Sequence, residues 1–350
     1  MPSAASPRIL VLRRRYVGDI VLLESVFRLL RRHWPAAHIV ASVDPAYRDL
    51  PKLHPAIDAT LPMPVRFRDW PGFLWRLRRG KFTHILDFDN RPRTAMIALL
   101  SGASLRATLR HGAEPRFARC YNHRLVVETN YFDDHHITDF YHRLLRSVGI
   151  AIKQEPGHLI PLPHEITQIE QLPAIAALPT DRPRLLVHPG SRSPHRIWPA
   201  ASFATVCDAI QSEGRASVIF VAGPAEQPVV EAITAKMTTP ATVLKNAFTL
   251  TQLAALFASV DRLLCHDSGP MHLATSVGTP VVALYGSQKI TNWKPVGDDN
   301  LLLQTPLPCR DCVSPGFCKP DDSYTNHCVQ KITPEAVLSA LRTRLPAPVA

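Results

Sequence analysis

The sequence predicts an α/β protein built from two doubly wound domains, each with a central parallel sheet between layers of helices. Short apolar strands alternate with helical repeats through both halves of the 350-residue chain. Prolines gather between Glu155 and Arg184, and the alternation begins again after them. Since 46% of the residues are hydrophobic, each half has enough apolar side chains for its own core.

The first half opens with an apolar strand at residues 8–12, which leads into a turn at Gly18-Asp19. Beyond this turn the apolar residues recur with helical spacing, so the segment predicts a strand, a glycine turn and a helix. Later segments predict strands at 38–43 and 81–87 and a helix at 94–100. We expect residues 1–160 to form one Rossmann-like domain.

The second half begins at Arg184, after a proline-rich segment at 161–183 that we expect to link the domains. The pattern predicts strands at 184–188, 217–222, 242–244, 262–266 and 280–285, and helices at about 200–213, 228–237, 250–258 and 271–276. Residues 184–333 are therefore the expected second domain, and 334–350 a final helix and tail.

The most informative segment is the turn at Asp267-Ser268-Gly269, which lies between an apolar strand and a predicted helix containing His272. Backbone N–H groups at the start of a helix point toward one place and favour an anion. The turn is expected at the carboxyl edge of a parallel sheet, where open α/β folds bind ligands. A nucleotide diphosphate fits such a site.

The formal net charge of +11 is unevenly distributed along the chain. Residues 1–160 contain 25 Lys and Arg against 14 Asp and Glu, whereas residues 161–350 contain 15 of each. A basic first half indicates either an anionic partner or a solubilising surface. The anionic partners to consider are a phosphorylated glycolipid, a nucleic acid or an acidic membrane face. The first residues lack a secretory signal pattern, so a cytoplasmic protein is expected.

These motifs together resemble glycosyltransferase family 9, the ADP-heptose-dependent heptosyltransferases of lipopolysaccharide synthesis. The resemblance runs from Ile9 to about Val337, and it is carried by Gly18-Asp19, Trp198-Pro199, Asp267-Ser268-Gly269-x-x-His272 and Gly278-Thr279-Pro280. It implies the GT-B fold, in which two Rossmann-like domains face a central cleft. It also implies an inverting enzyme that transfers a heptosyl group from ADP-heptose to a lipid-linked, phosphorylated inner-core acceptor, without a required cofactor.

By this resemblance, Asp19 is the general base that takes the proton of the acceptor hydroxyl. From its position alone, Asp19 could equally cap the first helix. The resemblance places the nucleotide sugar in the second domain, at Ser191, Arg192, Arg196, Glu226, Asp267, Ser268, Gly269 and His272. The family usually has a lysine where this chain has Arg196, which keeps the charge and changes the geometry.

Four cysteines, Cys309, Cys312, Cys318 and Cys328, lie within 20 residues and open with a C-x-x-C pair. In a cytosolic chain this spacing is typical of a structural zinc or iron site, and reduced thiols in a loop are the alternative. Asp87-Phe88-Asp89 looks like a metal-binding Asp-x-Asp motif. We discount it, because the nucleotide of a GT-B enzyme binds mainly to the second domain.

The acceptor is expected on the basic first domain. Candidate contacts for its phosphates are Arg14, Arg15, Arg66, Arg68, Arg93, Arg110 and Arg116. The aromatic and basic run at 67–76 either touches the membrane interface or forms a helix packed on the first sheet. Remaining alternatives are a transferase for another sugar or a protein acceptor, a sugar-nucleotide-binding protein without catalysis, and a nucleic-acid-binding protein, against which the lack of an arginine-rich tail argues.

Overall fold

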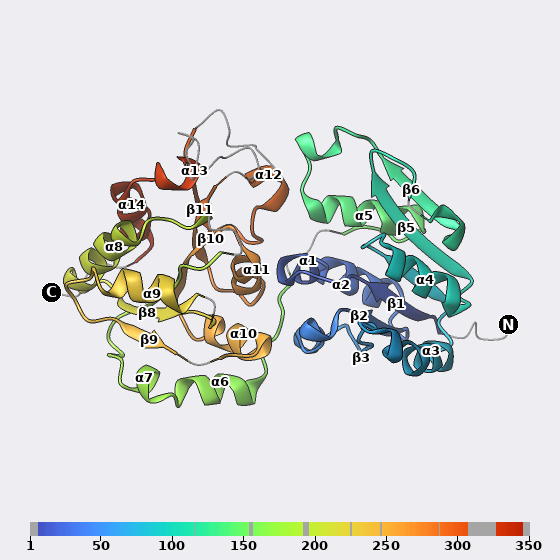
Figure 1. Ribbon diagram of the computed structural model, residues 1–350, viewed down its shortest axis with the longest axis horizontal. Coiled ribbons are helices and arrows are strands. Elements are labelled where there is room, and N and C mark those ends of the chain that lie inside the picture. Colours follow the sequence, from blue (N-terminus) through green and yellow to red (C-terminus); the bar gives the residue numbers. More distant parts are fainter. Residues whose placement is uncertain are drawn as a thin grey trace. The chain divides into compact units, whose positions relative to one another are not determined.

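The computed structural model describes residues 6–115, 117–153, 157–191, 196–224, 226–245, 247–286, 288–306 and 327–345. The chain divides into two compact units, Met1–Ile160 and Pro161–Ala350, and each contains one six-stranded parallel sheet. Figure 1 shows the elements of each unit. The prediction of an α/β protein with two doubly wound sheets is therefore confirmed.

The first unit has strand order β3-β2-β1-β4-β5-β6. Its strands are β1 (Arg8–Leu12), β2 (His38–Ser42), β3 (Ala59–Thr60), β4 (His84–Asp87), β5 (Leu105–His111) and β6 (His123–Val127). Its helices are α1 (Val17–Val21), α2 (Glu24–His33), α3 (Trp70–Arg79), α4 (Pro92–Ser101) and α5 (Ile137–Ser147). The order of the strands reverses between β1 and β4, which makes their carboxyl ends the switch point of this sheet.

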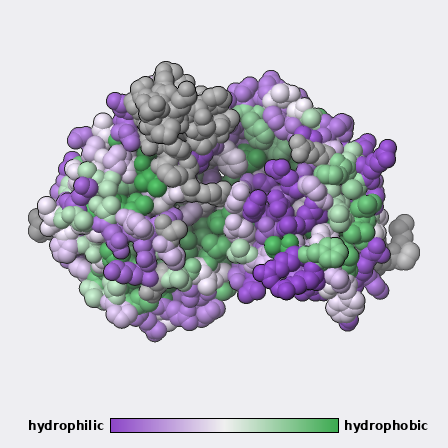
Figure 2. All heavy atoms as spheres, in the orientation of Figure 1, coloured by the Kyte–Doolittle hydropathy of each residue, from purple (hydrophilic) through white to green (hydrophobic). Residues whose placement is uncertain are grey.

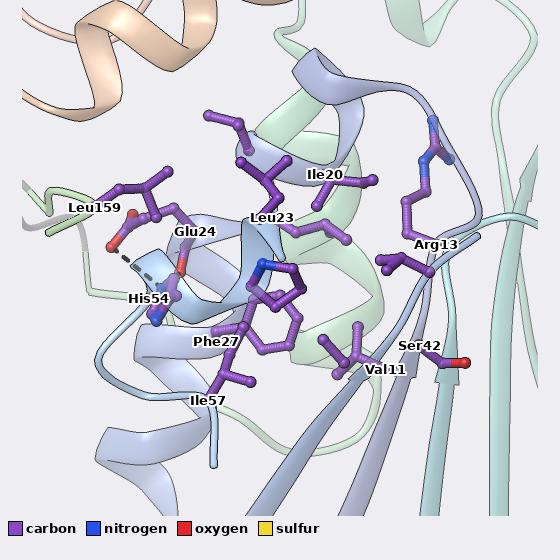
Figure 3. Close-up of a pocket in the computed structure, with 15 residues that line it drawn as sticks. Val11, Arg13, Ile20, Leu23, Glu24, Phe27, Ser42, His54, Ile57 and Leu159 are labelled. Atoms are coloured by element: carbon purple, nitrogen blue, oxygen red, sulfur yellow. Dashed lines mark hydrogen bonds and ion pairs between the residues drawn. The ribbon is translucent and has the colours of Figure 1, made fainter. Parts of the chain in front are cut away.

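Alternating side chains of β1 pack on opposite faces of the first sheet, as the period of a strand requires. Leu10 and Leu12 join Phe73 and Leu77 of α3 in one buried cluster. On the other face, Val11 lines a small cavity with Ile20 of α1, Phe27 of α2 and Leu23 between these helices (Figure 3). The cavity holds about 20 Å³, room for no more than about one water molecule.

The second unit repeats this topology, with strand order β12-β11-β10-β7-β8-β9. Its strands are β7 (Arg184–His188), β8 (Ser217–Val221), β9 (Thr242–Leu244), β10 (Arg262–His266), β11 (Val281–Tyr285) and β12 (Leu301–Gln304). Its helices are α6 (Pro163–Glu170), α7 (Pro173–Ala176), α8 (Ala200–Ser212), α9 (Gln227–Thr234), α10 (Leu250–Ala258), α11 (Gly269–Ser276), α12 (Ile290–Trp293), α13 (His327–Gln330) and α14 (Pro334–Arg344). Here the switch point lies between β7 and β10.

Trp198 anchors the loop after β7 to the core of the second unit. Its ring is fully buried and lies edge-on to Phe203, with 5.0 Å between the ring centroids. The indole Nε1–H donates to the carbonyl of Ile332 at 2.8 Å, and the backbone N–H donates to His266 Nε2 at 2.8 Å. Because the ring is buried and both the indole and the backbone N–H of Trp198 are hydrogen-bonded, this residue holds the loop against the end of β10.

Two segments of the second unit show helices that begin with a proline in the first turn. The proline-rich segment 161–183 contains α6 and α7, and α6 packs on α10, where Thr251 Oγ1 donates to Glu165 Oε1 at 2.8 Å. Helix α11 begins at Gly269, two residues earlier than predicted, with Pro270 in its first turn. In both places proline occupies the start of a helix, where its missing N–H costs no hydrogen bond. In the described part of the chain, no helix is both long and apolar enough to cross a bilayer.

Candidate functional site

Asp19 lies in the turn after β1, at the switch point of the first sheet. It is the third residue of α1, and its Oδ2 accepts a hydrogen bond from the backbone N–H of Tyr16 at 3.0 Å. Asp19 is therefore not the N-cap of α1, although its side chain accepts a hydrogen bond from the N-cap residue, Tyr16. The other carboxylate oxygen, Oδ1, pairs with the Arg13 guanidinium. Both contacts fix the direction of a carboxylate whose side chain is 15% exposed.

Arg13 is a site residue that the sequence analysis did not single out. Its guanidinium pairs with Asp19, donates to the carbonyl of Phe88, and lies 5.8 Å from the centre of the Tyr141 ring. Burial lowers the pKa of Arg13, but Tyr141 and Asp19 outweigh burial, so the net shift of this pKa is upward. The side chain is a permanent cation at the end of β1.

Two more ion pairs occupy the same edge of the first sheet. Arg14 Nε lies 2.8 Å from Asp89 Oδ2, and Arg93 Nη1 lies 3.2 Å from Asp44 Oδ1. Arg14 follows β1, Asp44 follows β2 and Asp89 follows β4, and Arg93 is in the first turn of α4. Arg14 and Arg93 are thus two of the predicted acceptor contacts that lie at the switch point. Arg116 lies outside the described residues.

Asp87, the first residue of the Asp-x-Asp motif, is fully buried at the end of β4. It accepts hydrogen bonds from the Tyr121 hydroxyl at 2.6 Å and from the backbone N–H of Asp89 at 2.8 Å. Burial raises the pKa of Asp87 to about 6, against the lowering effect of these hydrogen bonds. Its partners are protein groups that shape the turn into α4.

In the second unit, Glu226 and Gly190 form one side of the switch point. Glu226 Oε2 accepts from the backbone N–H of Gly223 at 3.0 Å and lies 3.5 Å from His188 Nε2. A Cβ atom at Gly190 would overlap Glu226 Oε1, so a larger residue there would require the Glu226 side chain to move. Ser191, which follows Gly190, is partly exposed in the same loop.

Asp267 and Arg196 form the other side of this switch point. Asp267 follows β10 and is 7% exposed, and its Oδ2 lies 3.6 Å from Arg196 Nη1. This distance is too long for a hydrogen bond, and Oδ2 has no other hydrogen-bond partner among the described residues. Burial raises the pKa of Asp267 to about 6, and the charge of Arg196 works in the opposite direction.

Helix α11 starts beside Asp267. Ser268 precedes the helix, and its hydroxyl donates to the carbonyl of His266 at 3.1 Å, while Gly269 is the first helical residue. His272 lies in the first turn and is 5% exposed. The start of the helix thus follows directly after Asp267, which lies 3.6 Å from the Arg196 guanidinium, and backbone N–H groups near a guanidinium suit phosphate oxygens.

Two histidines at the strand ends complete the second-unit site and were missed as site residues. His188 ends β7 and His266 ends β10, and both are buried. Burial, and secondarily the charge of His188, lowers the pKa of His266 to about 3, so its Nε2 stays free of a proton and accepts from Trp198. Their position as the last residue of an apolar strand was the signal that could have found them.

Some predicted residues fall outside what the structure describes. These are Arg192, Cys309, Cys312 and Cys318, together with the side chain of Cys328. Within the described ranges, no group of three or more His, Cys, Asp or Glu is arranged to hold a metal ion. Cys120, Cys207 and Cys265 are free thiols.

Two Rossmann-like units with charged side chains at each switch point are the plan of GT-B glycosyltransferases. Residues 73–316 match the family model of "Glycosyltransferase family 9 (heptosyltransferase)", and the chain belongs to this family of enzymes. It is 28% identical over 290 residues to the lipopolysaccharide core heptosyltransferase OpsX of Haemophilus influenzae, covering 81% of this chain and 80% of that one. It is 24% identical over 293 residues to lipopolysaccharide heptosyltransferase 2 of Salmonella typhimurium, covering 80% and 82%.

Solved structures agree with the fold. A glycosyltransferase family 9 structure from Veillonella parvula has a TM-score of 0.83 and 23% identity, covering 97% of this chain and 98% of that one. The ADP-heptose lipopolysaccharide heptosyltransferase II of Escherichia coli has a TM-score of 0.78 and 20% identity, covering 96% and 98%. The expected GT-B fold is therefore confirmed.

Proposed function

We propose that this enzyme transfers a heptosyl group from ADP-heptose to a lipid-linked, phosphorylated acceptor of the lipopolysaccharide inner core, with inversion at the anomeric carbon. The second unit holds the donor, and the first unit supplies the base and receives the acceptor. The named relatives that act on lipopolysaccharide support the substrate class. The observation that carries the assignment is the buried Asp267 carboxylate beside Arg196, because it suits a ligand that is both a polyol and an anion.

Asp267 Oδ2 is the proposed contact for the sugar. A buried acceptor atom without a hydrogen bond costs about 1–3 kcal/mol, which a ligand hydroxyl recovers by donating to it. A phosphate oxygen offers no proton at neutral pH and would be repelled by the carboxylate. The sugar hydroxyls are therefore the part of the donor that fits Asp267.

The diphosphate is assigned to Arg196, Ser191 and the start of α11 at Ser268 and Gly269, with Arg192 and His272 as further contacts. A guanidinium, a hydroxyl and backbone N–H groups can all donate to phosphate oxygens. As the bond to the sugar breaks, negative charge grows on the leaving ADP, and fixed donors stabilise it most at that stage. Glu226, with its side chain 27% exposed, is assigned to the ribose hydroxyls.

Asp19 is the proposed general base. The acceptor hydroxyl attacks the anomeric carbon, the bond to ADP breaks, and the hydroxyl proton passes to the Asp19 carboxylate. The hydrogen bond from Tyr16 and the ion pair with Arg13 keep this carboxylate at the end of β1. In this role Arg13 positions the base and does not itself react.

The basic first unit is the proposed acceptor side. Arg14 and Arg93 lie at its switch point, paired with Asp89 and Asp44, respectively. Each arginine could bind an acceptor phosphate in place of its aspartate. Because such an acceptor is anchored in a membrane, the enzyme is expected to work as a peripheral protein at the membrane surface.

The test is transfer with defined substrates. The full-length protein is incubated with ADP-heptose and lipopolysaccharide lacking inner-core heptose, and both ADP release and the mass of the lipopolysaccharide are measured. We expect ADP release that depends on the acceptor and a product heavier by one heptosyl unit. ADP release without a heavier lipopolysaccharide, or equal transfer from UDP-glucose, would overturn the proposed function.

A further inference from the structure

The outer side of α3 and the turn before it form an unusual surface on the first unit. Phe67 is 92% exposed and Trp75 is 61% exposed, although large aromatic side chains normally avoid water. The inner side of the same helix is fixed, because Phe73 and Leu77 are fully buried in the core. Trp75 is thus presented by a helix whose inner side is packed in the core, and Phe67 by the turn before that helix.

Basic residues surround these aromatic side chains. Residues 65–81 contain six Lys and Arg against one acid, Asp69. The Asp69 carboxylate accepts hydrogen bonds from the backbone N–H groups of Arg66 at 2.8 Å and Val65 at 3.3 Å, so it serves the turn. The basic residues are Arg66, Arg68, Arg76, Arg78, Arg79 and Lys81, all of them exposed.

A shallow, open depression of about 670 Å³ lies on this surface. It is lined by Leu74, Trp75, Arg78, Arg79 and Leu100, and the Arg79 guanidinium lies 5.1 Å from the centre of the Trp75 ring. The neighbouring helix α4 adds Met96, 48% exposed, and Leu99, 50% exposed. On the face of the first unit seen in Figure 2, hydrophobic residues lie beside strongly hydrophilic ones.

We propose that this α3–α4 surface docks onto an anionic phospholipid bilayer. Aromatic and aliphatic side chains enter the interfacial region, and the arginines contact the lipid phosphates. The inference rests on the proposed function, since a lipid-anchored acceptor requires a membrane nearby. It adds the surface, the helix and the lipid charge that the proposed function leaves open.

Two simpler explanations account for only part of this surface. The helix dipole favours basic residues in the last turn of α3, where Arg76, Arg78 and Arg79 lie. It does not explain why Trp75 and Phe67 are exposed. Nucleic acid binds to arginines and stacks on aromatic rings, but such binding does not explain why the aliphatic side chains Met96 and Leu99 are exposed. A bilayer interface accommodates the basic, aromatic and aliphatic groups together.

The test is vesicle binding by the full-length protein, measured by co-sedimentation with phosphatidylcholine vesicles and with phosphatidylcholine–phosphatidylglycerol vesicles. We expect clear preference for the anionic vesicles. Since each basic residue near an anionic surface contributes about fivefold to binding, Arg76→Gln/Arg79→Gln should weaken it at least about tenfold. The control Arg342→Gln/Arg344→Gln removes the same charge from α14 and should change binding less than about twofold.

The apolar part is tested with Phe67→Ala/Trp75→Ala. We expect this double variant to bind anionic vesicles more weakly. In the wild type, brominated lipid should quench part of the tryptophan fluorescence, and Trp75→Phe should lose that quenched part. Equal binding to both vesicle types, equal losses in the α3 and α14 variants, or tighter binding to single-stranded RNA at the same salt would overturn the docking surface.

Activity separates this inference from the proposed function. With a deacylated, water-soluble core acceptor, the α3 variants should match the wild type in turnover. If the wild type transfers no heptose to that acceptor, the proposed function fails whatever the vesicles show. If it transfers heptose but does not bind anionic vesicles, the docking surface alone fails.

Discussion

Arg196 Nη1 lies 3.6 Å from Asp267 Oδ2 in the second unit, close enough for charge attraction and too far for a hydrogen bond. The two side chains come from the loop after β7 and the turn after β10, which are neighbouring strands at the switch point. Among the residues that the structure describes, Arg196 Nε and Asp267 Oδ2 have no hydrogen-bond partner, which leaves capacity for a ligand of mixed character. A nucleotide sugar brings phosphate oxygens for the cation and hydroxyls for the carboxylate.

Arg196→Gln is expected to weaken ADP binding by about 10-fold to 100-fold, because a hydrogen bond to a charged group contributes about 1.5–3 kcal/mol. Isothermal titration calorimetry with ADP measures the change. Arg215→Gln is the matched control, since Arg215 pairs with Glu213 elsewhere in the same unit. Equal affinity of Arg196→Gln and the control for ADP would remove Arg196 from the nucleotide site.

Asp267→Asn is expected to stabilise the protein without ligand at pH 7 more than at pH 4. Burial raises the pKa of Asp267 from 3.8 to about 6, so the folded state carries a costly charge once the pH exceeds this value. This pKa shift lowers the unfolding free energy of the wild type by about 3 kcal/mol above pH 6. The loss develops progressively between pH 4 and pH 6 and is absent in more acid solution. Urea unfolding of wild type and variant at several pH values checks this. A difference in unfolding free energy that does not vary with pH would contradict it.

The contribution of His266 to the unfolding free energy changes with pH in the opposite direction. Its pKa is lowered to about 3 from the ordinary 6.5, so the unfolded protein binds this proton before the folded protein does. The contribution to stability is present above pH 6.5 and is lost as the pH falls toward 3, by about 1.4 kcal/mol per pH unit. His266→Gln should flatten this part of the acid unfolding curve relative to wild type, as measured by circular dichroism. Parallel curves would show that His266 does not titrate in this way.

Gly190→Ala is expected to lower the unfolding free energy by no more than about 1 kcal/mol, because the added methyl group overlaps the end of the Glu226 side chain, which can move aside. In a Glu226→Ala background most of this penalty should disappear. Gly223→Ala is the matched control, since a Cβ atom there meets Glu226 Oε2 at an ordinary 3.5 Å. The same penalty in both backgrounds, measured by urea unfolding, would mean that Gly190 is required for another reason.

The strands and helices around the second-unit site could be predicted from sequence because local patterns specify them. Residues 262–266 are apolar enough for a buried strand, and Asp267-Ser268-Gly269 combines a helix-starting serine with a glycine. The partner of Asp267 could not be predicted with the same means. Arg196 and Asp267 are 71 residues apart, and only the pairing of β7 with β10 brings them together.

Arg13 shows what local patterns hide. Three consecutive arginines follow β1, and only the path of the turn decides that Arg13 faces Asp19 while Arg15 is exposed. For residues 67–76, a helix packed on the first sheet was one of two alternatives, and α3 has that form, with Pro71 in its first turn. Tertiary packing of Phe73 and Leu77 then stabilises the helix.

Asp19→Asn provides the most direct test of the proposed mechanism. The variant keeps the size of the side chain and removes the carboxylate that is proposed to accept the proton. Acceptor-dependent ADP release should fall by about 10²-fold to 10⁴-fold, while calorimetric binding of ADP stays within about twofold of wild type. The matched control Asp58→Asn changes an ion-paired aspartate before β3, at the opposite edge of the first sheet, and should retain full turnover. Turnover in Asp19→Asn equal to that of Asp58→Asn would contradict a role for Asp19 as the base.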